Sequence, residues 1–252
     1  MAFEVLQLHA GPARYETFFL QLLGYWAQVL CSGCLLLRTG TWHVGVWTPA
    51  SIAALFVSAA LDCAAQALAF VSQTYGGYTL FVLFNSSVTL FSCLFALLLP
   101  WTPRPRPKQW CGVFSIVLGI VQTAIPSPVV ARISFSVGLT SSLLSALSGA
   151  ASFPVCELIF HCTPQAPTAE MASFCGSLIT AGVFTAWTAT YTVPRWEEAV
   201  VAPIYQSAEP SVGMAVFGYV AFALMVGLHG VSFWKSVARL GTAPTAVAKG
   251  AQ

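Results

Sequence analysis

The sequence predicts an all-α, polytopic membrane protein, a helix bundle of about seven transmembrane helices. Charged residues make up only 7% of the chain and hydrophobic residues 57%, whereas soluble domains contain roughly 25% charged residues. The apolar residues are grouped in stretches of about 20 residues, the length that crosses a hydrocarbon core of ~30 Å. Tryptophans mark the ends of several stretches, as is typical of helices that meet the membrane surface.

Seven apolar spans follow one another along the chain. The fourth is short for a membrane span, and the fifth is long enough to tilt or to emerge from the bilayer. Residues 72–79 are uncharged and are expected to form a turn between the second and third spans, and residues 194–211 are expected to form a short loop. The spans are Thr17 to Leu37, Ala50 to Val71, Tyr78 to Leu99, Trp110 to Thr123, Ile133 to Phe160, Met171 to Val193 and Val212 to Phe233.

The second and third spans carry a line of polar residues. Asp62 lies one helical turn before Gln66 in the second span, and Tyr78, Asn85, Thr89 and Ser92 share one face of the third. An ionised aspartate near the middle of a bilayer costs at least ~2.5 to 3.5 kcal/mol, so Asp62 is expected to face the bundle interior or a water-filled cavity. The alternative is that Asp62 is neutral, or is paired with Gln66, and joins two helices.

The fifth and sixth spans carry small hydroxyl side chains at helical spacing. Ser141, Ser145, Ser148 and Ser152 lie on one face of the fifth span, followed by Pro154 and Glu157, and the sixth repeats the pattern with Ser173, Ser177 and Thr180. Two interpretations stay open, since such a face permits close helix approach and can also line a substrate path. Glu157 is a second carboxylate candidate, either functional or structural.

The seventh span contains a histidine, His229, between Gly227 and Gly230. An imidazole in this position can take up a proton at acidic pH. The alternative interpretation is a histidine that is hydrogen-bonded for structural reasons.

Several classes of function are not supported by the sequence. A net charge of +2 gives no basis for binding nucleic acid. The chain contains no recognisable catalytic or phosphate-binding motif, so no enzyme activity is expected. Cys31 and Cys34 have the spacing of a metal or redox pair, but neither flanking charges nor a histidine cluster accompany them, so the eight cysteines are interpreted as small packing residues. No metal and no cofactor is expected.

The distribution of basic residues predicts an orientation. With seven spans, one side of the membrane carries Arg14, Arg132 and Arg195, and the other carries Arg38, Arg104, Arg106, Lys108, Lys235, Arg239 and Lys249. Seven basic residues against three place the second set, and hence the basic loops, in the cytosol.

Three runs of the sequence resemble the drug/metabolite transporter superfamily. They are Ala59-Ala60-Leu61-Asp62, then Gly76-Gly77-Tyr78-Thr79-Leu80-Phe81-Val82-Leu83-Phe84, and then Lys108-Gln109-Trp110-Cys111-Gly112-Val113 leading to Gly119-Ile120. Within that superfamily the pattern is most similar to the chloroquine-resistance-transporter-like group, with solute-carrier-35-like relatives close behind. The run Val155-Cys156-Glu157-Leu158-Ile159-Phe160 resembles the sixth helix of that group.

The resemblance implies a fold of ten helices in two inverted halves that works by alternating access around a central cavity. The seven spans then correspond to family helices two to eight, and the run from Gly241 to Lys249 to the entry of helix nine. The first and last helices of the family are accordingly expected to be absent. The chain is one transporter domain over residues 1–252, in which residues 1–127 belong to the first repeat and 132–252 to the second.

Composition and resemblance together indicate a secondary transporter of small organic solutes in an endomembrane of vacuolar, Golgi or plastid-like type. Metabolites, nucleotide sugars, amino acids, peptides and thiols all remain open as substrates. The expected substrate-binding residues are Asp62, Gln66, Asn85, Thr89, Ser145 and Glu157, and the candidates for proton coupling are Asp62, Glu157 and His229. The expected partners are the substrate and the lipid bilayer, with a homodimer as an open alternative. The alternative function is a non-transporting membrane protein, the remnant of a truncated transporter gene.

The predicted orientation can be tested by labelling. Cysteines introduced at Pro105 and at Ser207 are expected to react with a membrane-impermeant reagent from opposite sides, and Pro105→Cys from the cytosolic side. Reaction of both from one side would contradict the span count.

Overall fold

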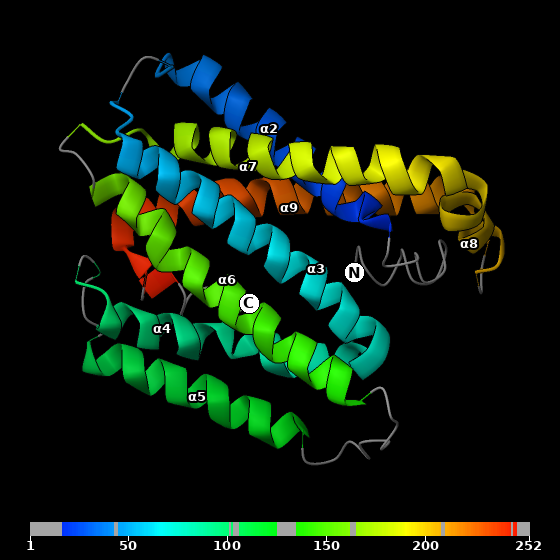
Figure 1. The fold of residues 1–252 in the computed structure, drawn as a ribbon, viewed down its shortest axis with the longest axis horizontal. Coiled ribbons are helices and arrows are strands. Elements are labelled where there is room, and N and C mark those ends of the chain that lie inside the picture. Colours follow the sequence, from blue (N-terminus) through cyan, green and yellow to red (C-terminus); the bar gives the residue numbers. More distant parts are fainter. Residues whose placement is uncertain are drawn as a thin grey trace. The chain divides into compact units, whose positions relative to one another are not determined.

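The computed structural model describes residues 17–42, 45–100, 102, 106–124, 135–161, 165–207, 210–242 and 244–245. The helices in this part of the chain are α2 (Phe19–Thr39), α3 (Pro49–Ser86), α4 (Val88–Leu98), α5 (Pro107–Ala124), α6 (Phe135–His161), α7 (Ala169–Trp187), α8 (Ala202–Tyr205) and α9 (Val212–Leu240). These ranges contain no strand. The protein is therefore all-α, as the sequence predicted (Figure 1).

Five of the described helical segments are long and apolar enough to cross a membrane. They are Phe19–Thr39, Pro49–Gln73, Ser136–His161, Ala169–Arg195 and Val212–Leu240. These five confirm a polytopic membrane helix bundle and overlap five of the seven expected spans, the last of them continuing beyond its expected end at Phe233 to Leu240. Of the other two expected spans, Tyr78 to Leu99 is divided between the end of α3 and the 11-residue α4, and Trp110 to Thr123 lies within the 18-residue α5.

The expected turn at residues 72–79 is wrong, because α3 continues as helix for 38 residues, from Pro49 to Ser86. No proline interrupts this stretch, and the break between α3 and α4 falls instead at Ser87. Figure 1 shows the C-terminal part of α3 curving back before α4 begins, so the chain changes direction without leaving helical geometry. The start of α3 is well defined, since Thr48 and Ser51 form a capping box with Pro49 in the first helical turn.

The expected loop at residues 194–211 is helical over much of its length. α7 passes into a π-helix at Thr188–Thr192, a 3₁₀ turn at Val193–Arg195, a second π-helix at Glu197–Val201 and the short helix α8. Pro194 is tolerated because it stands at the first turn of the 3₁₀ segment, where a missing backbone N–H costs little. Ala199 and Val200 are buried, so packing also favours helix here.

The chain forms two compact units. Unit 1 comprises Met1–His43 and Ala169–Ser232, and unit 2 comprises Val44–Thr168 and Phe233–Gln252. Each unit thus combines segments from distant parts of the sequence, and α9 contributes its beginning to unit 1 and its end to unit 2. This grouping differs from the proposed repeats, 1–127 and 132–252. That division concerns internal similarity and stays a prediction.

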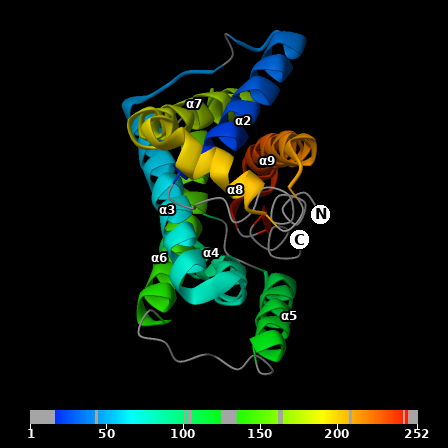
Figure 2. The ribbon, with the colours of Figure 1, turned by 90° about the vertical axis from the view of Figure 1, so that its right-hand side faces the viewer.

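In unit 1, α2 and α7 lie side by side (Figures 1 and 2). The rings of Tyr25 and Phe184 stack with 5.6 Å between their centroids. Further along the pair, the amide of Gln28 donates a hydrogen bond of 3.2 Å to the hydroxyl of Ser173, which also lies 3.2 Å from the hydroxyl of Ser32. Gln28, Ser32 and Ser173 are all buried.

Within unit 1, Gly227 and Gly230 of α9 lie against α2. A Cβ atom built on Gly227 would lie 2.9 Å from the backbone carbon of Ala27, and one on Gly230 would overlap the side chain of Gln28. The backbone of Ala27 cannot move as readily as the end of a side chain, so Gly227 permits a close helix approach that a larger residue would prevent.

In unit 2, α3 and α6 run antiparallel. The hydroxyls of Ser72 and Ser142 are hydrogen-bonded, and that of Ser145 donates to the carbonyl oxygen of Ala65 at 2.8 Å. Val46 and Gln165 are joined by a backbone hydrogen bond of 2.7 Å at the other end. A core cluster of Val88, Ala146, Ala150 and Phe153 connects α4 to the same helix. Ser142 and Ser145 of α6 therefore take part in close packing against α3.

Replacement of Gly227 by alanine should destabilise the protein by about 1 to 3 kcal/mol, because the added methyl group meets the α2 backbone. Gly182→Ala in α7 is the matched control, since a Cβ atom there meets nothing within 4 Å. The control should be neutral or slightly stabilising, by up to ~1 kcal/mol. Thermal unfolding of the two variants in detergent micelles measures the difference, and equal melting temperatures would contradict the close approach.

Candidate functional site

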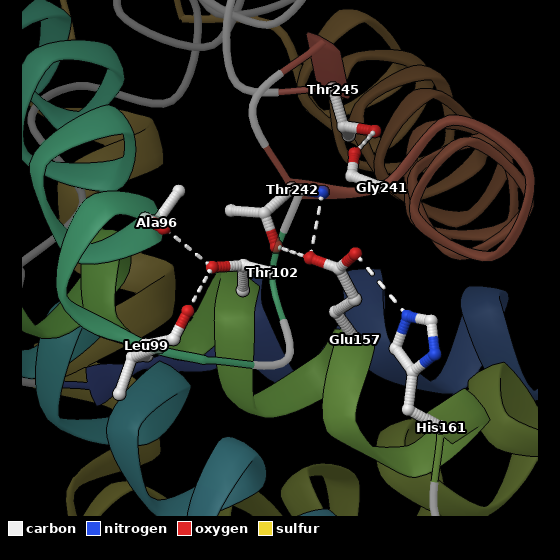
Figure 3. A network of polar contacts seen from close by, with 8 residues as sticks. All are labelled: Ala96, Leu99, Thr102, Glu157, His161, Gly241, Thr242 and Thr245. Carbon is white, nitrogen blue, oxygen red and sulfur yellow. Dashed lines mark hydrogen bonds and ion pairs between the residues drawn. The ribbon is translucent and has the colours of Figure 1, made fainter. Parts of the chain in front are cut away.

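Glu157 lies at the centre of a polar network in unit 2 (Figure 3). Its side chain is only 3% exposed. One carboxylate oxygen, Oε2, accepts a hydrogen bond of 3.0 Å from the backbone N–H of Thr242 and a second from the hydroxyl of the same residue. The other oxygen, Oε1, lies 3.4 Å from Nε2 of His161, one helical turn further along α6. The carboxylate therefore joins α6 to the segment after α9.

The end of α9 brings Thr242 to this position. Gly241 has a φ of 81°, in the left-handed region, and its N–H donates to the carbonyl of Val237 at 3.0 Å. A left-handed glycine ends a helix by turning the chain away from its axis. Beyond the turn, the hydroxyl of Thr245 donates to the carbonyl of Gly241 at 2.8 Å. Thr242 and Thr245 are both buried, so the segment is packed as well as hydrogen-bonded.

Aromatic contacts also hold the end of α9 against α6. The rings of Phe153 and Phe233 meet edge to face with 5.0 Å between centroids, and those of Phe160 and Trp234 with 6.2 Å. Thr102, also drawn in Figure 3, closes the end of α4 by donating to the carbonyls of Ala96 and Leu99. Glu157 therefore lies on α6 between the aromatic contacts of Phe153 and Phe160, and hydrogen-bonded turns end α4 and α9.

Pro154 affects the backbone of α6 just before Glu157. A proline has no N–H, so the carbonyl of Ala150 loses its usual partner within the helix. The hydroxyl of Ser92 in α4 donates to that carbonyl at 3.5 Å, a long hydrogen bond. The proline therefore leaves the carbonyl oxygen of Ala150 available to accept a hydrogen bond from α4.

Ser145 is buried on the face of α6 that meets α3. Its hydroxyl is bonded to the Ala65 carbonyl, next to Gln66 in sequence. This hydrogen bond to α3 supports close helix approach, which is one of the two interpretations of the serine face. Ser145 and Glu157 are 12 positions apart in one helix, which corresponds to about 18 Å along its axis. The two residues therefore cannot contact the same small ligand group.

The remaining predicted site residues lie on α3 and α4. Asp62 and Gln66 are partly buried, one turn apart on α3, near the Ala65 contact with Ser145. Thr89 is buried beside Val88, which belongs to the core cluster with α6. Asn85 is exposed near the end of α3. The structure therefore gathers Asp62, Gln66 and Ser145 at one level of the α3–α6 pair and leaves Asn85 outside it.

His229 is exposed and lies in the part of α9 that belongs to unit 1. In the described part of the chain, no group of three or more His, Cys, Asp or Glu side chains is arranged to hold a metal ion. Seven of the eight cysteines are free thiols, and Cys162 lies outside the described residues.

Sequence reasoning missed three hydrogen-bonding residues that the structure supplies, Gln28, Ser32 and Thr242. Gln28 and Ser32 lie four residues apart in α2, a spacing that places both on one helix face toward Ser173. Thr242 follows a glycine at the end of an apolar stretch, which signals a helix end. Neither sequence signal identifies the residue to which these side chains bind, Ser173 in the first case and Glu157 in the second.

Comparison with known proteins gives the fold alone. No family model matches the chain, and no curated protein matches it. Five chains of solved structures do match. One of them, described only as "Crystal structure of protein", is 16% identical with a TM-score of 0.55, over 99% of this chain and 95% of that chain. At this identity the likeness assigns neither a family nor a function.

Replacement of Ser145 by alanine should destabilise the protein by about 0.5 to 1.5 kcal/mol, because it removes a buried hydrogen bond between helices. Ser232→Ala is the matched control, since that exposed hydroxyl donates only to the Leu228 carbonyl of its own helix. Melting temperatures of both variants in micelles test this. A stable Ser145→Ala protein that has lost solute uptake would instead favour substrate lining.

Proposed function

We propose that the protein is a secondary transporter that moves small organic solutes across an endomembrane by alternating access. The observation that carries this proposal is the presence of two carboxylates within apolar helices, Asp62 in α3 and the buried Glu157 in α6. Ionisable residues inside membrane spans are costly, and they commonly mark paths for substrates or protons. The resemblance of the sequence to the drug/metabolite transporter superfamily points the same way.

The proposed solute contacts are the polar groups gathered on α3 and α6, with Asp62 and Gln66 as the main ones. These two side chains are partly buried, and they are the part of the predicted set that stands beside the α3–α6 contact. Asn85 is a weaker candidate because it is exposed, and Thr89 is buried near the core. The solute itself is proposed only as a small organic molecule, and the protein as a transporter rather than an enzyme.

A second function has a specific observation in its favour. The hydroxyl of Ser145 and both oxygens of Glu157 are engaged by other parts of the same chain. Such pairing is what a membrane protein without transport activity would need for stability. The two proposals differ at Asp62, because only transport gives that carboxylate a role beyond packing.

Asp62→Asn should fold and insert nearly normally, since the amide keeps the shape and hydrogen-bonding capacity of the carboxylate without its charge. If Asp62 carries protons or contacts solute, this variant should lose pH-gradient-driven uptake into proteoliposomes. Uptake of a panel of nucleotide sugars, amino acids, small peptides and thiols, chosen by ligand-induced thermal stabilisation, provides the measurement.

Asp62→Leu is the companion variant. If Asp62 only joins helices, the leucine should destabilise the bundle by about 1 to 3 kcal/mol, because it would leave the partly buried Gln66, one turn away, without its partner. An Asp62→Asn protein that folds and transports like the parent would remove Asp62 from the mechanism.

A further inference from the structure

We infer that one outward face at the end of α7 binds a phospholipid molecule, and that Arg195 on this face holds the phosphate of the lipid headgroup. The face consists of residues four positions apart, Val183, Trp187, Tyr191 and Arg195. It begins in α7, passes through the first π-helix and ends in the 3₁₀ turn, all within unit 1. The inference concerns how this helix meets lipid, so it does not depend on transport.

The face that carries these residues is turned away from the packed side of α7. Val183 is 50% exposed and Trp187 is 42% exposed, and Arg195 is exposed as well. The other side of the same segment is packed, since the ring of Phe184 is buried and stacks on Tyr25 of α2. In a protein that spans a membrane, an apolar helix side that does not pack on protein meets lipid.

The aromatic residues of the face support the arginine. The rings of Trp187 and Tyr191 are stacked, with 5.3 Å between centroids and 28° between planes. The guanidinium carbon Cζ of Arg195 lies 4.3 Å from the centroid of the Tyr191 ring, a cation–π contact. Stacking covers the flat side of a guanidinium and leaves its N–H groups pointing outward in the plane, where they can donate two parallel hydrogen bonds to a phosphate. Arg195 is therefore held in position before the anion arrives.

The length of the face matches the depth of one lipid leaflet. Val183 and Arg195 are 12 positions apart, which corresponds to at most ~18 Å along a helix axis. Half of a hydrocarbon core is about 15 Å thick. The segment Ala169–Arg195, which is long and apolar enough to cross a membrane, ends at the arginine. Trp and Tyr side chains are typical of the level between acyl chains and headgroups. With Arg195 at the phosphate, Val183 accordingly lies against the acyl chains.

Charges next to the site select the type of headgroup. Glu197 and Glu198 follow Arg195 within three positions, and both residues are exposed. Two carboxylates against one guanidinium repel a lipid that carries a net negative charge. A zwitterionic headgroup avoids this repulsion, because its phosphate meets Arg195 while its cationic group can lie near the carboxylates. The expected occupant is therefore a zwitterionic phospholipid such as phosphatidylcholine.

The test is thermal unfolding of the purified full-length protein in dodecyl maltoside micelles with one added lipid. Dioleoyl phosphatidylcholine should raise the melting temperature above that measured with the galactolipid dioleoyl monogalactosylglycerol, which has the same acyl chains and no phosphate. A difference of about 2 to 4 °C is expected once the phospholipid is about fivefold above its Kd. Equal melting temperatures in the two lipids would overturn the inference.

Two further probes identify the source of the phosphate. Dioleoyl phosphatidylglycerol carries a net negative charge and should stabilise the protein less than phosphatidylcholine does. An equal or larger effect would overturn the zwitterionic assignment. Glycerophosphocholine has the phosphocholine headgroup without acyl chains, so at equal concentration it should produce no shift. A full shift with this soluble molecule would indicate an anion site rather than a lipid site, and would equally overturn the inference.

Arg195→Ala should abolish the difference between phosphatidylcholine and the galactolipid. Arg38→Ala is the matched control, since Arg38 is exposed at the end of α2 in the same unit and, within the part of the chain that the structure describes, lies over no aromatic ring. The control should keep the full difference. Each variant is compared with itself in the two lipids, so a change in its basal stability does not imitate a loss of binding. A retained difference in Arg195→Ala, or an equal loss in both variants, contradicts the site.

Tyr191 is a positioning residue in this site. Tyr191→Phe keeps the ring beneath the guanidinium and should keep the difference between the two lipids. Tyr191→Leu removes the ring and should reduce the difference by about half or more. Arg195→Lys keeps the charge without the planar fork, so it should also reduce the difference. A Tyr191→Leu protein that shows the full difference would overturn the role given to stacking.

Discussion

The structure depends on one constraint, that hydrocarbon offers no hydrogen-bond partner to a polar group. Several polar side chains of the apolar helices meet this constraint by donating to a carbonyl of their own helix, as Ser177 does to Ser173, and others bond to a neighbouring helix. Gln28 bonds to Ser173 in unit 1, and Ser145 bonds to the Ala65 backbone in unit 2. Glu157 is the most demanding case, because it is a buried carboxylate that accepts two hydrogen bonds from a segment 85 residues away. The packing of α6 follows from these bonds as much as from apolar contact.

Much of the fold could be predicted from the sequence, since length and hydropathy determine which stretches can cross a membrane. The errors fall where the expectation rested on polarity alone. Residues 72–79 are polar and uncharged, but nothing in them forbids helix, and α3 continues through them. Residues 194–205 contain charges and two prolines, yet Pro194 and Pro203 each stand in the first turn of a helical segment, where a helix tolerates them. Polarity marks where a chain can meet water, and it does not by itself end a helix.

The candidate site was predictable residue by residue but not as an arrangement. The cost of burying a carboxylate singles out Asp62 and Glu157 in the sequence. The partner of Glu157 is Thr242, and that pairing depends on the left-handed turn at Gly241, which no spacing rule connects to α6. Asn85 was assigned to a shared face on the assumption of a separate third span. Its exposure follows from its actual place near the end of a longer, curved α3.

The two π-helical stretches after α7 have an evolutionary consequence. In an α-helix each residue advances the side-chain direction by about 100°. A π-turn accommodates one extra residue, so side chains beyond it point elsewhere than a continuous α-helix would place them. Thr188–Thr192 and Glu197–Val201 can therefore absorb single-residue insertions or deletions while the α2–α7 contact before them keeps its register. A change of one residue there would redirect the side chains that follow it and leave the stacking of Tyr25 on Phe184 unchanged.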